Sequence, residues 1–288
     1  MAQSEGMNYV ESFTFQAVRC LLAGLTLLPF VIGINIKNKR NALNGCPAEN
    51  IEDKKMLLKG GLICGAVFGV SVCLQQLGME YDTNPGKAAF ITALYIVLVP
   101  IFNIFLKRRP PLTIWIGVAI AVAGLYCLCV TDGLSGISTG DIFCILGSIG
   151  FACHILVIDY FGRKTNAIKL TCMQFFVASA GAGVFMLIFE KPSFSAILSA
   201  AVPILYSGVL SGGAAFTFQT IGQKYTKAES ASLIMSLESV VAVIAGMIIL
   251  KQFPSAREWI GCLLMSVAIV LAQIEPGKLK SKKTEEVN

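Results

Sequence analysis

Ionisable side chains inside long apolar stretches are the residues of this sequence that could do chemistry. Glu238 lies in Ser-Leu-Glu-Ser-Val-Val, near the centre of an apolar stretch over 228–250. A charged side chain at the centre of a bilayer costs about 3 kcal/mol or more, so it must face a wet cavity, pair with a cation or stay protonated. We predict that Glu238 binds a substrate ammonium group or a coupling proton. The alternative is a protonated carboxyl group that hydrogen bonds a neighbouring helix.

Two further ionisable residues lie in such stretches. Arg19 lies early in the stretch 14–36, where it could serve the same cavity, pair with Glu238, or snorkel to the membrane surface. His154 is the single histidine and lies inside the stretch 140–161. A histidine can carry protons at physiological pH, so a role in proton coupling stands beside a packing role.

Uncharged polar residues complete the predicted substrate and proton pathway. They offer hydrogen bonds without a full charge, and each could line a polar cavity or hold two helices together. They lie toward the ends of two stretches and on the stretches that follow: Gln75, Gln76, Gln219, Thr92, Tyr95 and Ser236.

The elements that must position these residues are nine apolar stretches separated by short polar connections. The hydrocarbon core of a bilayer is about 30 Å thick, so a spanning helix needs about 20 mostly apolar residues. The composition agrees, because 55% of the residues are hydrophobic and only 14% are charged, against about 25% charged in soluble domains. We therefore predict an all-α integral membrane protein, a polytopic helix bundle. The spans are 14–36, 57–79, 86–106, 112–130, 140–161, 168–189, 197–220, 228–250 and 256–274.

The basic residues are distributed unequally between the two sides of the predicted bundle. If the connection after the first span is cytoplasmic, 18 lysines and arginines lie on the inner side and four on the outer side. This positive-inside bias places the C-terminus in the cytoplasm and the N-terminus outside. It also explains the net charge of +6 without a nucleic-acid partner. We expect a plasma membrane, the inner membrane of a bacterium.

An internal repeat runs along the chain at a spacing of 144 residues. Five spans fit in one period, and because five is odd, the second copy must be inverted relative to the first. Inverted repeats are typical of secondary transporters, whose substrate site lies between the halves near the midplane. We predict a first repeat over 1–136, a second over 137–275 and a disordered basic tail over 276–288. The repeated residues are Gln75 and Gln219, Tyr81 and Tyr225, Pro110 and Pro254, and Trp115-Ile116-Gly117 and Trp259-Ile260-Gly261.

Three segments resemble the EamA-type transporters of the drug/metabolite transporter superfamily. They are residues 85–100 (PGKAAFITALYIVLVP), residues 228–240 (AESASLIMSLESV) and residues 13–19 (FTFQAVR). The resemblance implies ten helices, and this sequence has no counterpart of the first, which helps to line the central cavity in the family. Either a helix precedes this sequence in the complete protein, or the protein works without it.

Two departures from the family pattern carry structural expectations. Ser239 stands where the family has proline, so we expect a straighter helix there. Lys107 and Lys251-Gln252 replace the glycine-glutamate pairs that follow the fourth and ninth helices of the family.

The sequence therefore predicts a secondary transporter that moves small metabolites, amino acids or related compounds, outward by alternating access. No motif for hydrolysis, ATP binding or metal chemistry is present, so we predict neither an enzyme nor a bound cofactor. One alternative is a nucleotide-sugar or phosphate-ester carrier, which would need at least two cations facing the cavity. The other is a non-transporting truncated membrane protein. Protons are a candidate coupling ion, and a homodimer is compatible with the sequence.

Overall fold

The computed structural model is all-helical over the residues that it describes, which are 5–44, 54–81, 85–130, 138–249 and 255–273. The predicted tail 276–288 lies outside this part of the chain. In the first half the long elements are α2 (Ser12–Leu43), α3 (Lys54–Glu80), α4 (Pro85–Ala93), α5 (Tyr95–Phe105) and α6 (Leu112–Cys129).

The second half contains three continuous long helices and two segments built from shorter pieces. The long helices are α7 (Thr139–Gly162), α8 (Ala167–Phe189) and α14 (Ala256–Gln273). One broken segment contains α9 (Phe194–Ser199), α10 (Ala201–Leu205), the π-helix η1 (Tyr206–Ala215) and α11 (Phe216–Tyr225). The other contains α12 (Ala228–Met235) and α13 (Glu238–Ile249).

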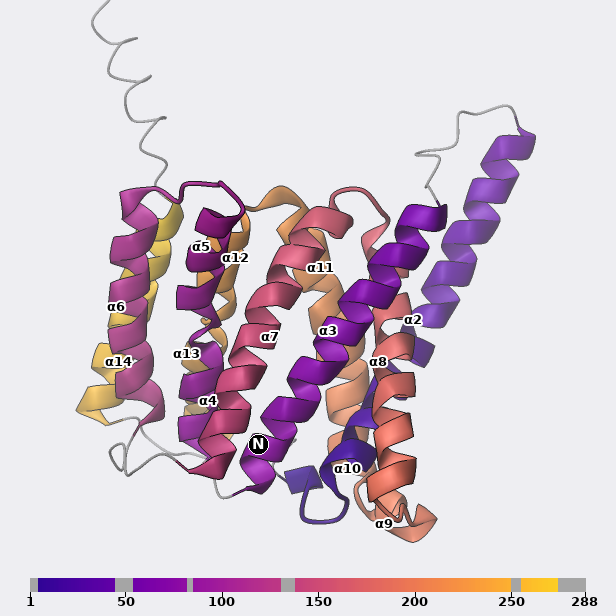
Figure 1. Cartoon of the computed structure of the whole chain (residues 1–288), viewed down its shortest axis with the longest axis horizontal. Coiled ribbons are helices and arrows are strands. Elements are labelled where there is room, and N and C mark those ends of the chain that lie inside the picture. The colour runs from indigo at the N-terminus through magenta and orange to yellow at the C-terminus, as the bar shows by residue number, and fades with distance from the viewer. Residues whose placement is uncertain (1–4, 45–53, 82–84, 131–137, 250–254, 274–288) are drawn as a thin grey trace, which may run out of the picture.

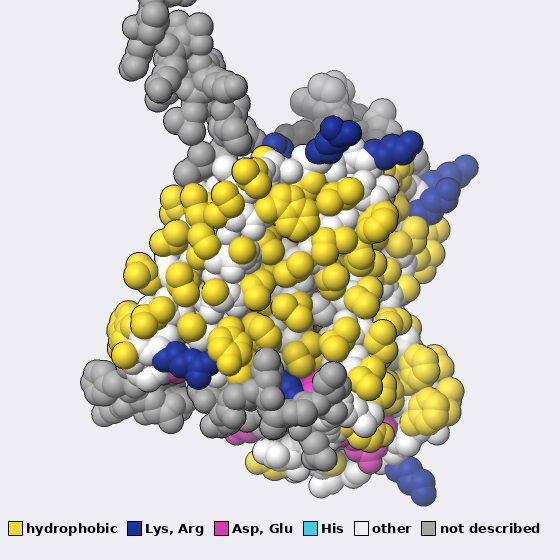
Figure 2. Space-filling view, turned by 60° about the vertical axis from the view of Figure 1, so that its left-hand side comes forward, with side chains coloured by type: hydrophobic (Ala, Val, Ile, Leu, Met, Phe, Trp, Pro, Cys, Tyr) yellow, Lys and Arg dark blue, Asp and Glu magenta, His cyan; other side chains and the backbone are white. Residues whose placement is uncertain are grey.

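The elements stand side by side in one bundle, with the connections gathered at its two ends (Figure 1). Within the described residues, seven helical segments are long and apolar enough to cross a membrane, from Ser12–Asn41 through Ala201–Tyr225. Figure 2 shows the corresponding band of hydrophobic side chains; lysines and arginines lie beyond both edges and are most concentrated beyond the upper one. We call that end, which carries Arg108, Arg163 and Lys227, the basic face.

Two predicted spans are interrupted near their middles, at related positions of the repeat. The span 86–106 breaks at Leu94, and the span 228–250 breaks at Ser236-Leu237. The expectation of a straighter helix around Ser239 is therefore wrong. The Ser232 and Ser236 hydroxyls donate to the carbonyls of Glu229 and Leu233, and such side-chain bonds compete with the helical ladder even without proline.

The 144-residue repeat is visible in α6 and α14. The bounds of α14 are those of α6 displaced by 144 residues. The two helices pack together and run in opposite directions (Figure 1). Their buried side chains, among them Leu125 and Met265, form one apolar core with α5, α12 and α13.

Repeated small residues explain why α6 and α14 approach so closely. A Cβ on Gly117 would lie 3.1 Å from the Ala268 carbonyl oxygen, and a Cβ on Gly261 would lie 2.9 Å from that of Gly124. Gly117 and Gly261 are repeat mates, and so are Gly124 and Ala268. The same contact therefore occurs twice, as a local twofold relation requires, and small residues at such crossings are typical of membrane helices.

Helix α7 is fastened to α4 and to the connection after α5 near both of its ends. Lys87 at the start of α4 forms an ion pair with Asp141, with a distance of 2.5 Å between the charged atoms. Near the other end, Arg108 forms one with Asp159 at 2.8 Å. Asp141 also belongs to a capping box with Ser138, which fixes the beginning of α7.

Lys107 adopts the left-handed backbone conformation, with φ of 58°, directly after α5 and its C-cap residue. Helices commonly end with such a residue, and glycine is the usual choice because a side chain is strained there. This is the position at which the family glycine was expected and is replaced by lysine. The chain keeps the turn and accepts the strain.

Candidate substrate site

Arg19 on α2 and Glu238 at the start of α13 are brought into electrostatic range of each other. Arg19 is only 3% exposed, whereas Glu238 is solvent-accessible. The two side chains form no direct ion pair. The break at Ser236-Leu237 places Glu238 in the first turn of α13, where the helix dipole favours a negative charge.

Two glutamines extend the polar surroundings of Arg19. Gln16 lies one turn before Arg19 on α2, so both occupy one face of that helix. Its Nε2 donates to the Oε1 of Gln76 on α3 at 3.0 Å, and both glutamines are fully buried. Within the described chain, three buried polar atoms here have no hydrogen-bond partner, namely Arg19 Nε, Gln16 Oε1 and Gln76 Nε2. Unpaired buried polar groups cost free energy, so these three atoms are favourable hydrogen-bonding sites for a polar ligand.

Helices α4 and α5 contribute Thr92 and Tyr95 on either side of the break at Leu94. Tyr95 is within electrostatic range of Glu238, which links the first-half break to the second-half break. Thr92 is 6% exposed, and its hydroxyl accepts a hydrogen bond from Gln75 Nε2 at 3.3 Å. Of the predicted residues in the first half, Gln75 and Thr92 therefore form one hydrogen-bonded pair, whereas Tyr95 interacts with Glu238 of the second half.

Three predicted residues have surroundings that separate them from this group. The Ser236 hydroxyl donates to the Leu233 carbonyl within its own helix. The Nε2 of the buried His154 lies 3.2 Å from the Oε1 of Gln174, and its ring packs at a tilt against Phe68, as expected for a packing residue. Gln219 is the fourth residue of α11, which ends at the basic face, whereas its repeat mate Gln75 lies near the end of α3, which is at the opposite end of the bundle (Figure 1). Inversion carries repeat mates to opposite depths, so these glutamines do not meet.

Comparison with known proteins identifies the family of this chain. The sequence pattern of the EamA-like transporter family matches residues 1–130 and again residues 138–273. The chain belongs to the EamA-like transporter family. It is thus a multi-pass membrane transporter with a small-molecule substrate, not an enzyme, and its two matched segments are repeated halves.

Relatives of this EamA-family chain extend over most of its length. An uncharacterized transporter of Archaeoglobus fulgidus is 26% identical over 274 residues, which are 93% of this chain and 79% of that protein. A protein of known crystal structure has the same fold, with a TM-score of 0.71 and 16% identity over 94% of this chain and 90% of the other.

Gln16 lies in the candidate site of this EamA-family protein, beside Arg19, and sequence reasoning did not select it. Its spacing of three residues from Arg19 is the signal that could have identified it, because the two must share a helix face. In the described ranges, no three His, Cys, Asp or Glu side chains gather in a way that could hold a metal ion.

Proposed function

We propose that this EamA-family protein exports small zwitterionic metabolites, amino acids or related compounds, across the plasma membrane by alternating access. The observation that carries the proposal is the relation between Arg19 and Glu238. Arg19 and Glu238 carry opposite charges and interact electrostatically without forming an ion pair. Arg19 could therefore bind the carboxylate of a small molecule while Glu238 binds its ammonium group. Tyr95 and the Gln16–Gln76 pair would supply further hydrogen bonds.

The proposed architecture is a nine-span bundle of two inverted repeats, over 1–136 and 137–275, with the substrate near the midplane. The basic face would be cytoplasmic, which puts the C-terminus inside and the N-terminus outside. Support comes from the opposite directions of α6 and α14 and from the related breaks at Leu94 and Ser236-Leu237. Discontinuous helices at corresponding positions of two halves are typical of transporter binding sites.

A phosphate-ester substrate is less well supported by the charges. Phosphate groups need several cations, and Arg19 is the only buried cation among the described residues. A buried arginine next to unpaired amide groups favours a binding role over a protein without transport, because ionisable residues inside membrane spans usually mark a substrate or ion pathway. Proton coupling and a homodimer remain predictions.

The experiment is counterflow in proteoliposomes with a panel of radiolabelled amino acids, organic acids, amines and sugar phosphates. We expect amino acids to exchange, and we expect Glu238→Gln and Arg19→Gln each to reduce exchange by at least tenfold, about 1.4 kcal/mol of lost binding or transition-state stabilisation. Glu11→Gln is the matched control, because Glu11 is an exposed carboxylate before α2 with no side-chain partner in the described chain.

Two results would contradict the proposal. One is undiminished exchange by folded Glu238→Gln, which would remove that carboxylate from the mechanism. The other is exchange of sugar phosphates but not of amino acids, which would favour the carrier of phosphate esters.

A further inference from the structure

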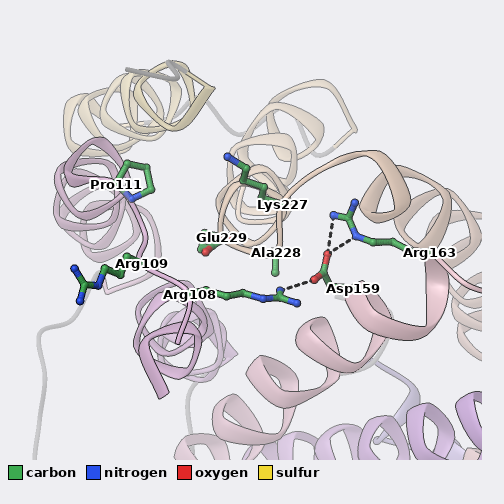
Figure 3. A pocket seen from close by; sticks show the side chains of 8 residues that line it. All are labelled: Arg108, Arg109, Pro111, Asp159, Arg163, Lys227, Ala228 and Glu229. Carbon is green, nitrogen blue, oxygen red and sulfur yellow. Dashed lines mark hydrogen bonds and ion pairs between the residues drawn. The ribbon is translucent and has the colours of Figure 1, made fainter. Parts of the chain in front are cut away.

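A pocket of about 360 Å³ lies at the basic face, away from the substrate site. It is formed by the connection after α5, the end of α7 and the beginning of α12, so both halves of the chain contribute to it (Figure 3). Its lining contains four cations and two carboxylates: Arg108, Arg109, Arg163, Lys227, Asp159 and Glu229.

Asp159 holds two arginines in this pocket, and it holds them unequally. Arg163 donates from both Nε and Nη2 to Oδ1, at 3.0 and 2.8 Å, and this i,i+4 pair was expected from the sequence. Arg163 Nη2 also donates to the Thr226 carbonyl at 2.8 Å. Arg108 makes a single bond, from Nη1 to Oδ2 at 2.8 Å. Asp159 therefore keeps a bidentate partner if Arg108 leaves, whereas Arg108 has one contact to lose.

The second carboxylate of the pocket lacks a partner. Glu229 is 8% exposed, and no described side chain forms a hydrogen bond or ion pair with its carboxylate. Its place in the first turn of α12 favours a negative charge through the helix dipole, but the dipole is a weak substitute for a counterion at a buried site. Figure 3 shows Arg108 reaching toward Asp159, with Glu229 on the other side of the same pocket.

We propose that Arg108 is an exchangeable latch between the two conformations of the transporter. In the conformation described here it binds Asp159 on α7, and in the other it binds Glu229 on α12. In each conformation one of the two carboxylates would then lack Arg108. When Arg108 exchanges partners, the connection after α5 would move from α7 toward α12. The inference rests on the two-conformation mechanism proposed above, and not on the identity of the substrate.

The test measures the exposure of the pocket directly. Ala228 lines the pocket and is 2% exposed, so a cysteine there reacts with a hydrophilic maleimide only when the pocket opens. Ala228→Cys protein in lipid nanodiscs, which leave both faces accessible, is labelled and quantified by mass spectrometry of its tryptic peptide. The chain with Ala228 intact gives the background from native cysteines.

The latch predicts shifts of opposite sign. Asp159→Asn and Glu229→Gln should change the labelling rate of Ala228→Cys in opposite directions, each by about two- to fivefold, the scale of a partly exposed ion pair. In an Arg108→Gln background, Glu229→Gln should have no further effect, whereas Asp159→Asn can still act through Arg163. Arg109→Gln is the matched control and should leave labelling unchanged, because Arg109 is the neighbouring exposed arginine of the pocket and forms no ion pair with any described side chain.

Shifts of the same sign, or a Glu229→Gln variant that labels as the parent does, would overturn the latch. If Asp159→Asn does not fold, Glu229→Gln still tests the latch when it is compared with and without Arg108→Gln. Its effect on the labelling rate of Ala228→Cys must vanish when Arg108 is absent. A labelling shift in a protein that fails the counterflow assay would refute the proposed substrate and keep the latch. Normal counterflow of amino acids with no labelling shift would refute the latch and keep the proposed substrate.

Discussion

The close crossing of α6 and α14 makes a sharp prediction about Gly261. A methyl group at this position would lie 2.7 Å from Leu128 Cγ and 2.9 Å from the Gly124 carbonyl oxygen. The oxygen belongs to the backbone of the facing helix and cannot rotate away. Ordinary contact begins at about 3.4 Å, so the two helices must separate by about 0.5 Å to admit an alanine.

The expected loss follows from two opposing terms. Overpacking a well-filled contact costs about 1–3 kcal/mol, and replacing a helical glycine by alanine returns about 0.5–1 kcal/mol. We expect Gly261→Ala to lose about 1–2 kcal/mol of stability. A kcal/mol corresponds to about 2–4 °C for domains of 150–250 residues, so the apparent Tm should fall by several degrees.

The assay is thermal unfolding in detergent, followed by size-exclusion chromatography of the remaining folded fraction. Gly181→Ala on α8 is the matched control, because a Cβ there meets no atom within 4 Å, and its apparent Tm should stay unchanged or rise. If Gly261→Ala is as stable as the wild type while Gly181→Ala behaves as expected, the crossing is not as tight as described.

Two further predictions concern single residues. Lys107→Gly should raise stability by about 0.5–1 kcal/mol in the same thermal assay, because glycine removes the strain of a left-handed backbone; a fall in the apparent Tm would contradict the strain. His154→Gln should cost about 1 kcal/mol of stability through its contact with Gln174 yet keep counterflow within about twofold; loss of flux or of its response to a pH gradient would instead assign His154 to proton coupling.

The sequence was sufficient to predict an all-helical membrane protein with repeated halves, because these signals are periodic and local. The bounds of α6 and α14 follow the 144-residue repeat, and the recurrent glycine of Trp-Ile-Gly marks the place where these helices touch. Apolar length located the segments, but it could not reveal the breaks at Leu94 and Ser236-Leu237. The break at Ser236-Leu237 depends on the carbonyls to which the Ser232 and Ser236 hydroxyls donate, and the hydrophobic pattern does not contain that information.

The candidate site was predictable only in part, since it depends on distances between helices. Glu238 and Arg19 were selected because each is costly in a bilayer, and their proximity could be proposed but not measured from the sequence. Gln219 was grouped with Gln75 by repeat register, although an inverted repeat sends the two to opposite ends. The pocket carboxylate of Glu229 was not predicted from the sequence, because acidic residues are common in the first turn of a helix and the sequence does not show that this one is buried.

The ion pairs near both ends of α7 have a mechanical consequence. Helix α7 follows the repeat boundary in the chain, yet Lys87 and Arg108 fasten it to first-half elements at two points along its length. With the exchange of Arg108 proposed above, the Lys87 pair would hold the beginning of α7 to α4 in both conformations, whereas the Arg108 pair would hold its other end only in the conformation described here. Helix α7 would then swing about its beginning, so the moving parts of the transporter would not coincide with the two repeats, and a hinge should be sought near Asp141.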